Sequence, residues 1–367
     1  MERYNRHRLI DWFSQETLSR TTAIVVGAGA VGNEVIKNLA LLGVGRIRVY
    51  DLDLIEEHNL TRSVLFRESD IGHPKAEVAA SRAQQMDPNI SVAAFHGDFW
   101  ETLKLSELAE SDVLFCCVDN FEARIRCNTL CYLTGIDFVN IGIDSRFSVV
   151  ELFPFSTTRQ QGCFECNLPH TVYRRISERY SCGHLRKLSF IEKKIPTTII
   201  TSTASASLAV SLALRFGRED EVLTPTRLYL DTIGGALTRT DLTKATACPC
   251  CGRFSEKPNF FVSKRHIAEW EDAWELDATV ITSEPILVGY RLNGSETSIF
   301  DRASKYDSTF PSTVSDTPDA VDLEVRDQFL LSELVDRFSG KQIPSKFALI
   351  IAQGQTWICE FQEGAST

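Results

Sequence analysis

The sequence predicts an α/β protein with a doubly wound, mostly parallel sheet and a small C-terminal α+β domain. Three observations carry this prediction. A short apolar run, a glycine turn, a helical stretch and a second apolar run follow one another in residues 22–51. Further short strands alternate with helical stretches, which is typical of doubly wound α/β folds. Residues 256–367 have few glycines and a different texture, so we expect a domain boundary near residue 255.

The first elements form a βαβ unit. Ala23–Val26 and Ile47–Tyr50 are short apolar runs, as expected for strands of a parallel sheet that is buried on both faces. The helix between them carries apolar residues at helical spacing and ends at Gly43. Leu114–Val118 and Phe138–Ile141 are predicted to be later strands of the same sheet.

The remaining chain is less regular. Residues 198–215 are rich in Ala, Ser, Thr and Leu, which predicts a buried helix that packs closely through small side chains. Strands are expected at 279–282, 286–291 and 347–361, and a polar loop at 301–320.

Composition excludes several classes of protein. The 367 residues contain 49 acidic and 39 basic side chains, so the net charge is −10 and a non-specific nucleic-acid binder is not expected. We expect no membrane span and no signal peptide, because no apolar run of about 18 residues occurs and the start lacks an apolar core. We therefore expect a cytoplasmic protein. Its eleven cysteines cannot all pair, and in a reducing compartment clustered cysteines more often bind metal or do chemistry.

A glycine motif follows the first strand. Gly27, Gly29 and Gly32 have the GxGxxG spacing, which brings backbone N–H groups and a helix N-terminus to a phosphate. Asp51 ends the second strand, 19 positions after the last glycine, where a carboxylate suits a ribose hydroxyl. The pattern predicts a Rossmann-like nucleotide site, but nicotinamide dehydrogenases have the same pattern.

Three further motifs distinguish these possibilities. Asn59-Leu60-Thr61-Arg62 and Gly72-His73-Pro74-Lys75 follow the second strand, and Cys117-Val118-Asp119-Asn120 with Arg124 follows a later one. The basic residues put positive charge where a triphosphate would lie, and Asp119 at a strand end could hold Mg²⁺. A hydride-transfer enzyme needs neither, so we interpret the site as one for ATP.

Two CxxC motifs predict that the α/β fold also contains a structural zinc site. Cys163 and Cys166 form the first pair, and Cys248 and Cys251 the second. Four thiolates are the ligand set of a closed zinc site. The pairs are 82 positions apart, so the fold must bring them together. Cys250 leaves a second possibility, in which Cys248 and Cys250 are the ligating pair; buried free cysteines are a third.

Residues 3 to about 252 resemble the ThiF-like family, which includes molybdopterin-synthase and thiamine-biosynthesis adenylyltransferases and ubiquitin-activating enzymes. Arg3-Tyr4-Asn5-Arg6-His7 matches the family's N-terminal motif, ahead of the motifs described above. Within the family, a bacterial activating enzyme for a ubiquitin-like protein is the favoured interpretation. The resemblance implies that ATP adenylates the C-terminal glycine of a small ubiquitin-like or sulfur-carrier protein, with residues 1–255 as the adenylation domain.

The resemblance also implies roles for individual residues. Arg6 would reach the partner subunit's site in a homodimer. The glycine loop would bind the nucleotide through Gly27, Gly29 and Gly32, and the ribose would be bound by Asp51 and Asp53. The phosphates would be bound by Asn59, Arg62 and Lys75 of the NLTR and GHPK motifs. Mg²⁺ would be bound by the last motif, with Asp119 and Asn120. The expected cofactors are Mg²⁺ and Zn²⁺ besides ATP.

Cys182 lies in a polar segment with Arg179, His184 and Arg186, whose charges favour a thiolate. Family members that form a thioester carry their cysteine here. We therefore favour thioester formation and transfer to a conjugating enzyme, with residues 256–367 in partner recruitment. Adenylation of a sulfur carrier is the alternative, and a non-catalytic family member is another.

Overall fold

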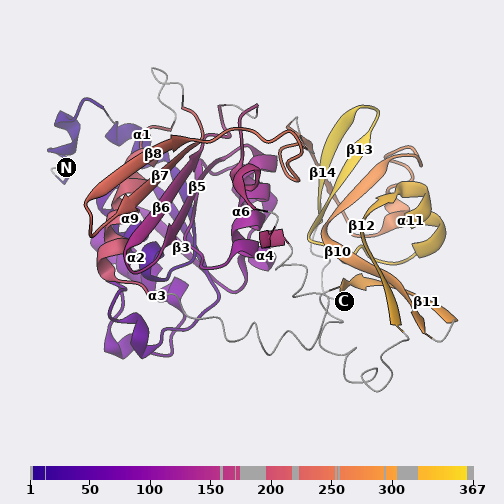
Figure 1. The fold of residues 1–367 in the computed structure, drawn as a ribbon, viewed down its shortest axis with the longest axis horizontal. Coiled ribbons are helices and arrows are strands. Elements are labelled where there is room, and N and C mark those ends of the chain that lie inside the picture. Colours follow the sequence, from indigo (N-terminus) through magenta and orange to yellow (C-terminus); the bar gives the residue numbers. More distant parts are fainter. Residues whose placement is uncertain are drawn as a thin grey trace. The chain divides into compact units, whose positions relative to one another are not determined.

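The computed structural model describes residues 3–12, 14–157, 160–169, 171–173, 196–216, 223–252, 254, 257–292, 295–303 and 321–361. The chain divides into two compact units (Figure 1). The first contains Met1–Leu168 and Lys194–Ser255, and the second contains Glu256–Thr367 together with the described residues 169 and 171–173. No helix among the described residues is long and apolar enough to cross a membrane.

An eight-stranded sheet forms the centre of the first unit, in the order β3-β2-β1-β4-β5-β6-β7-β8. The five strands from β3 to β5 are parallel, and β6, β7 and β8 are antiparallel to their neighbours. The bounds are β1 Thr22–Val26, β2 Arg46–Asp51, β3 Ser91–His96, β4 Val113–Cys116, β5 Asp137–Ile143, β6 Phe147–Phe153, β7 Thr226–Asp231 and β8 Ala236–Asp241.

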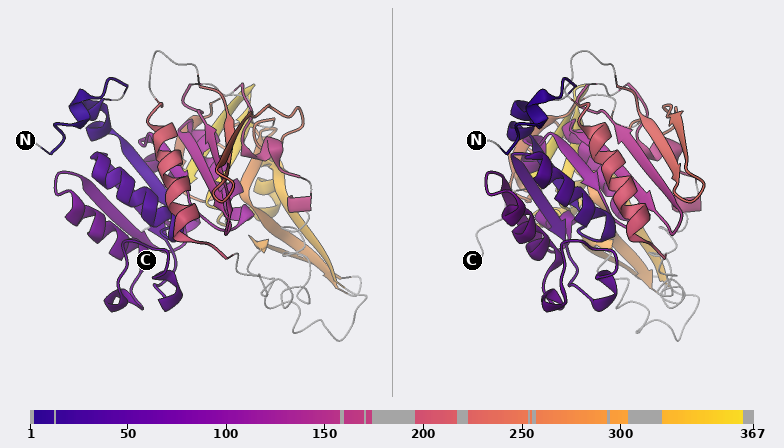
Figure 2. Two further views of the ribbon diagram at one scale, coloured as in Figure 1. Left: turned by 60° about the vertical axis from the view of Figure 1, so that its left-hand side comes forward. Right: turned by 90° about the vertical axis from the view of Figure 1, so that its left-hand side faces the viewer.

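Helices cover this sheet as a doubly wound fold requires. α2, α3 and α9 share one apolar core with the parallel strands, and α2 and α9 lie side by side in both views of Figure 2. The strand order reverses at β1, so right-handed crossovers put α6 on the other face. The helices are α1 Gln15–Arg20, α2 Ala30–Leu42, α3 Lys75–Met86, α4 Phe99–Thr102, α5 Leu105–Ala109, α6 Phe121–Thr134 and α9 Ile199–Ala213, with 3₁₀ turns η1 His7–Leu9, η2 Glu57–Asn59, η3 Glu68–Asp70 and η4 Phe164–Asn167.

The predicted fold class is confirmed, and local chemistry explains its first elements. All five residues of β1 are buried, as its unbroken apolar run requires of a strand covered on both faces. Gly43 ends α2 in the left-handed conformation, with φ at 75°. The small-residue helix is α9, whose Ser205, Ala206 and Ala209 are fully buried.

The second unit contains a six-stranded sheet in the order β11-β10-β13-β14-β9, with β12 also paired to β10. All pairs are antiparallel except β14 with β9. Helix α11 packs against β12, and its Leu334 and Phe338 join Trp270 in a separate core. The bounds are β9 Asn259–Ser263, η5 Ile267–Glu269, β10 Thr279–Leu292, β11 Ser295–Arg302, β12 Val321–Leu330, α11 Leu331–Phe338, β13 Phe347–Ala352 and β14 Gln355–Phe361.

Two strand predictions in this unit were wrong in detail. The segments 279–282 and 286–291 belong to one strand, β10, whose pairing is irregular between Ile281 and Ile286. The segment 347–361 is a hairpin of two strands, because Gln353 and Gly354 adopt positive φ and turn the chain. Residues 304–320 of the predicted loop lie outside the described residues.

Candidate functional site

The three glycines of the loop after β1 have different surroundings. Gly27 has a φ of +93°, and a Cβ there would lie 2.8 Å from the carbonyl oxygen of Cys117. A Cβ on Gly32 would lie 1.8 Å from the carbonyl oxygen of Gly27. Around Gly29, by contrast, no atom lies within 4 Å of an added Cβ. Two glycines therefore allow the tight turn, and the third leaves open space at the N-terminus of α2, where a phosphate can approach.

Asn33 holds this loop in place, although no sequence pattern marks it as a site residue. Its side-chain amide donates to the carbonyl oxygen of Ala28 at 2.6 Å, and its Oδ1 accepts from the N–H of Leu65 at 2.9 Å. The side chain is fully buried. Asn33 thus fastens the segment that follows the NLTR motif to the glycine loop.

Asp51 lies where the sequence predicted, beside the glycine loop at the end of β2. Its Oδ2 accepts from the N–H of Ala28 at 2.6 Å, and its Oδ1 accepts from the N–H of Asp53 at 2.8 Å. Burial raises the pKa of this carboxyl, although these backbone donors and Lys75 oppose the shift. The carboxylate therefore ties the end of β2 to the loop.

Lys75 and Asp53 form an ion pair at the start of α3. Lys75 Nζ donates to Asp53 Oδ2 at 2.7 Å. The lysine side chain is 10% exposed and the carboxylate 58%. The isolated bridge Leu54–Pro74 and the backbone bond from Lys75 N–H to the Asp53 carbonyl fix both residues. The GHPK motif is thereby held next to the end of β2.

The NLTR segment starts in η2. Asn59 is buried, and its Oδ1 accepts from the N–H of Glu56 at 2.9 Å. Arg62 is partly exposed and donates to the carbonyl oxygen of His58 at 2.7 Å. Asn59 therefore shapes the turn, and Arg62 is the more accessible of the two side chains.

Asp119 and Asn120 follow β4 on the far side of the glycine loop. Asp119 is exposed, and Asn120 Nδ2 donates to its Oδ1 at 3.4 Å. The Asn120 side chain caps α6 by accepting from the N–H of Ala123 at 2.9 Å. An exposed carboxylate oxygen beside a glycine loop is a suitable ligand for Mg²⁺.

Arg124 was expected to add positive charge for a triphosphate, but the structure gives it another role. Its guanidinium donates to the carbonyl oxygen of Val118, to the carbonyl oxygen of Ile141 at 2.7 Å and to Asn140 Oδ1 at 2.5 Å. These three acceptors belong to the protein, so Arg124 supports the loop that carries Asp119.

Arg6 lies away from these residues. Its segment is anchored by Tyr4, which donates to Asp87 and packs against Gly43 at the end of α2. Burial, together with Asp87, raises the pKa of Tyr4 to about 12. The glycine loop is at the other end of α2, whose 13 residues span about 20 Å. Arg6 is therefore not part of the nucleotide site of its own chain.

The four predicted zinc ligands come together. The Sγ atoms of Cys163, Cys166, Cys248 and Cys251 lie within 4.8 Å of one another. Neighbouring pairs are 3.2 to 4.0 Å apart, against about 3.8 Å for four thiolates around Zn²⁺ at 2.3 Å. Cys250 is buried and is not one of the four.

Within this cluster the environment favours a thiolate at Cys166 and neutral thiols at the other three cysteines. The N–H of Cys163 donates to Cys166 Sγ at 3.4 Å. Hydrogen bonds from Cys163 and the other cluster thiols lower the pKa of Cys166, whereas they raise the pKa of Cys251. Cys166 is thus the sulfur that accepts hydrogen bonds from the neighbouring thiols, and a bound Zn²⁺ would displace the protons of those thiols.

Sheet topology explains how two distant motifs meet. Leu152 near the end of β6 lies opposite Thr226 of β7, and Thr226 lies opposite Asp241 at the end of β8. The segments after β6 and β8 therefore leave the sheet at the same edge. There, Gly162 approaches the carbonyl oxygen of Thr243 so closely that a Cβ would lie 2.6 Å from it.

The predicted nucleophile Cys182 lies outside the described residues. Cys116, Cys127 and Cys131 are fully buried and therefore pack in the core. Cys117 is partly buried under the glycine loop, and burial raises the pKa of its thiol.

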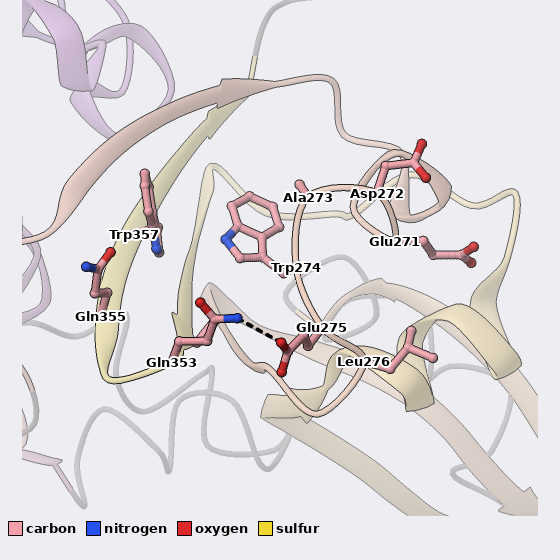
Figure 3. Close-up of a pocket in the computed structure, with 10 residues that line it drawn as sticks. Glu271, Asp272, Ala273, Trp274, Glu275, Leu276, Gln353, Gln355 and Trp357 are labelled. Atoms are coloured by element: carbon pink, nitrogen blue, oxygen red, sulfur yellow. Dashed lines mark hydrogen bonds between the residues drawn. The ribbon is translucent and has the colours of Figure 1, made fainter.

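The second unit has a hollow of about 430 Å³ between the loop after η5 and the β13–β14 turn (Figure 3). Glu271, Asp272 and Glu275 line it together with Trp274 and Trp357, and Gln353 donates to Glu275 at 2.8 Å. None of the predicted site residues lines this hollow.

The sheet order and the helices on both of its faces define the first unit as a doubly wound α/β protein, with the glycine loop at the carboxyl ends of its parallel strands. Residues 4–250 match the ThiF family, to which the chain therefore belongs.

Two relatives show the range within this family. The SAMP-activating enzyme E1 of Haloferax volcanii is 36% identical over 143 residues, which are 38% of this chain and 53% of that protein. The sulfur carrier protein adenylyltransferase of Thermus thermophilus is 28% identical over 257 residues, or 69% of this chain and 91% of that protein. The chain thus spans about half of the first relative and most of the second.

The solved structures agree on the fold. The crystal structure of E. coli MccB with succinimide matches with a TM-score of 0.56 at 24% identity, over 68% of this chain and 74% of that chain. At this identity the match supports the fold of the first unit.

Proposed function

We propose that this protein is an ATP-dependent adenylyltransferase that activates the C-terminal glycine of a small ubiquitin-like or sulfur-carrier protein. One observation carries the proposal: the glycine loop, Lys75 and Asp119 lie at the carboxyl edge of the parallel strands, on both sides of the point where the strand order reverses. Relatives named as a SAMP-activating enzyme and a sulfur carrier adenylyltransferase support it.

The residues suit this reaction because its main barrier is electrostatic. The carrier's carboxylate must attack the α-phosphorus of ATP, and both groups are anionic. Lys75 and Arg62 would reduce this repulsion, and Asp119 would hold the Mg²⁺ that neutralises the phosphates. No general base is needed, since the carboxylate is already ionised at neutral pH. The site must chiefly position its substrates.

The test is ATP–pyrophosphate exchange with candidate carriers that end in glycine. Exchange that depends on the carrier supports adenylation. Its absence with every carrier, in protein that binds ATP and Mg²⁺, would contradict the proposal. A carrier whose C-terminal carboxylate is amidated is the matched control, because it keeps the fold of the carrier and loses the reacting group.

Thioester formation on Cys182 is the finer part of the proposal. The measurement is intact mass after incubation with ATP, Mg²⁺ and the true carrier. Cys182→Ala should keep pyrophosphate exchange and lose the reducible adduct, since the acyl-adenylate forms before the thiol attacks. Cys117→Ala is the control, because Cys117 is the partly exposed thiol nearest the glycine loop and its pKa is raised.

The same measurement separates the two branches of the family. A chain that adenylates well and never forms an adduct belongs with the sulfur-carrier branch. An adduct on Cys182 supports conjugation, with a conjugating enzyme as the next acceptor. The relatives include both kinds of protein, so neither branch is favoured by similarity alone. In the conjugation branch, we propose that the second unit recruits that acceptor.

We further propose a homodimer in which Arg6 acts on the partner subunit's site. The distance of Arg6 from its own glycine loop supports this arrangement. Mixing equal amounts of Arg6→Ala and Asp119→Ala protein should restore about a quarter of the active sites, because half of the dimers are mixed and each has one complete site. No recovery after subunit exchange would exclude the trans role.

Zinc at the four-cysteine cluster and a cytoplasmic location complete the proposal. The ligand set and spacing suit zinc, and free thiols persist in reducing compartments. Nucleic acid and membranes are not among the proposed partners.

A further inference from the structure

Two sets of contacts fix the backbone on either side of Asp119. Before it, the N–H of Cys117 donates to the carbonyl oxygen of Val26 at 2.8 Å, and the carbonyl oxygen of Val118 accepts from Arg124. After it, Asn120 caps α6. Asp119 itself is exposed. A carboxylate that points to solvent thus sits on a backbone held from both sides.

Arg124 bonds both the loop that carries Asp119 and the neighbouring strand β5. One nitrogen of its guanidinium donates to Val118, and another donates to the carbonyl oxygen of Ile141 and to Asn140 Oδ1. The last two acceptors belong to β5. Arg124 therefore joins the loop after β4 to the neighbouring strand.

A buried chain of polar groups continues from this point. Asn140 Nδ2 donates to Glu151 Oε2 at 2.7 Å, and Glu151 Oε1 accepts from Arg227 Nε at 2.8 Å. Glu151 is 2% exposed, so its charge depends on these partners. The hydrogen bond to Glu151 fixes the orientation of the Asn140 amide, and the amide oxygen therefore faces Arg124.

We infer that Arg124 is a positioning residue for Asp119: it holds the loop after β4 so that this carboxylate stays beside the glycine loop for a magnesium nucleotide. The inference rests on the proposed function for its ligand. A lysine at this position keeps the charge but offers a single nitrogen, which cannot serve all three acceptors in the same geometry. Without the clamp, Asp119 would sample positions away from the metal, and Mg²⁺ would bind more weakly.

The test measures binding of ATP to the full chain by calorimetry across a range of Mg²⁺ concentrations, with no carrier present. In Arg124→Lys, the Mg²⁺ concentration for half-maximal ATP binding should rise at least about tenfold, because the metal ligand is less well placed. Binding of ATP in the presence of a chelator should stay as in the wild type. Arg126→Lys is the matched control on the same helix, since Arg126 pairs with Glu122 on its surface.

A double-mutant cycle with Asp119→Asn separates positioning from general stability. If Arg124 acts through Asp119, adding Arg124→Lys to Asp119→Asn should shift the Mg²⁺ midpoint little further. Additive shifts, or a wild-type midpoint in Arg124→Lys, would overturn the inference even if the variant melts at lower temperature. Wild-type protein that binds ATP with Mg²⁺ but never exchanges pyrophosphate would overturn the proposed reaction and leave the positioning role standing. If the wild-type protein does not bind ATP, both the proposed reaction and the positioning role of Arg124 are wrong.

Discussion

The two edges of the eight-stranded sheet carry sites of opposite character. At the carboxyl edge of the parallel strands, the glycine loop, Lys75 and Asp119 follow the neighbouring strands β1, β2 and β4, and open space or solvent adjoins Gly29 and Asp119. At the other edge, the segments after β6 and β8 bring four cysteines into a closed, largely buried cluster. The first edge is built to admit a ligand, and the second is built to join distant parts of the chain.

The largest expected effect is at the cysteine cluster. Cys163→Ser should abolish zinc binding and prevent stable folding of the first unit, since thiolate–zinc binding contributes on the order of 10 kcal/mol in small zinc domains. Metal analysis of protein never exposed to chelator, together with thermal unfolding, is the measurement. Cys250→Ala is the control and should keep the metal. Well-folded wild-type protein without zinc would contradict the zinc assignment.

The next effect is on activity at the opposite edge. Asp119→Ala should lower carrier-dependent pyrophosphate exchange at least about 100-fold, because the metal that neutralises the phosphates loses its ligand. Thermal stability should hardly change, since the side chain is exposed. Glu122→Gln removes a neighbouring carboxylate and should leave exchange intact. Exchange at the wild-type rate in Asp119→Ala would show that another residue binds the metal.

Two alanine substitutions in the glycine loop should separate folding from binding. Gly32→Ala drives a Cβ into the carbonyl oxygen of Gly27 and should cost about 3 kcal/mol of unfolding free energy. Gly29→Ala meets no atom within 4 Å, so it should change stability by less than about 1 kcal/mol and weaken ATP binding instead. Denaturant unfolding and calorimetry check both. Equal losses of stability in the two variants would show that Gly29 does not face open space.

The smallest effect concerns Asp137, on the border between the two halves of the sheet. Burial raises the pKa of Asp137 to about 6. The N–H and hydroxyl of Ser156 donate to its carboxyl and act in the opposite direction, lowering the pKa. A carboxyl with a raised folded-state pKa stabilises the fold below its unfolded pKa, near 4, and this contribution disappears as the pH rises through 6. The expected loss is about 2 to 3 kcal/mol between pH 4 and pH 8.

Asp137→Asn should remove this pH dependence, because the amide does not ionise and the Ser156 hydroxyl can turn to accept from it. Unfolding by denaturant at several pH values between 4 and 8 is the measurement. Parallel wild-type and variant curves across this range would show that another group causes the dependence.

The comparison also explains what the sequence could predict. The glycine loop, Asp51 and the NLTR and GHPK motifs are each read from a few adjacent residues, because parallel strands place successive turns at one edge. The four cysteines of the two CxxC motifs do lie together, but their meeting could be expected only from the family resemblance, because antiparallel pairing across β6, β7 and β8 brings the two motifs to the same place.

The supporting residues were the hardest to predict. Asn33 and Arg124 act through hydrogen bonds to backbone groups far along the chain, and no local pattern marks such partners. From its position in the sequence, Arg124 is simply one of the basic residues expected near the triphosphate, and its role in holding the loop is visible only in the structure. In the second unit, the β10 irregularity and the β13–β14 turn depend on pairing with other strands, so short apolar runs predicted strands with the wrong limits.

The meeting of the two CxxC motifs has a consequence for the order in which the chain assembles. The strands and helices from β1 to β3 make contacts between near neighbours in the sequence and can form early. The metal-binding residues are separated by 82 positions, so their complete set exists only after β6, β7 and β8 have paired. We therefore expect metal capture to be a late kinetic step, and a chelator added during refolding to trap an intermediate whose first strands have already formed.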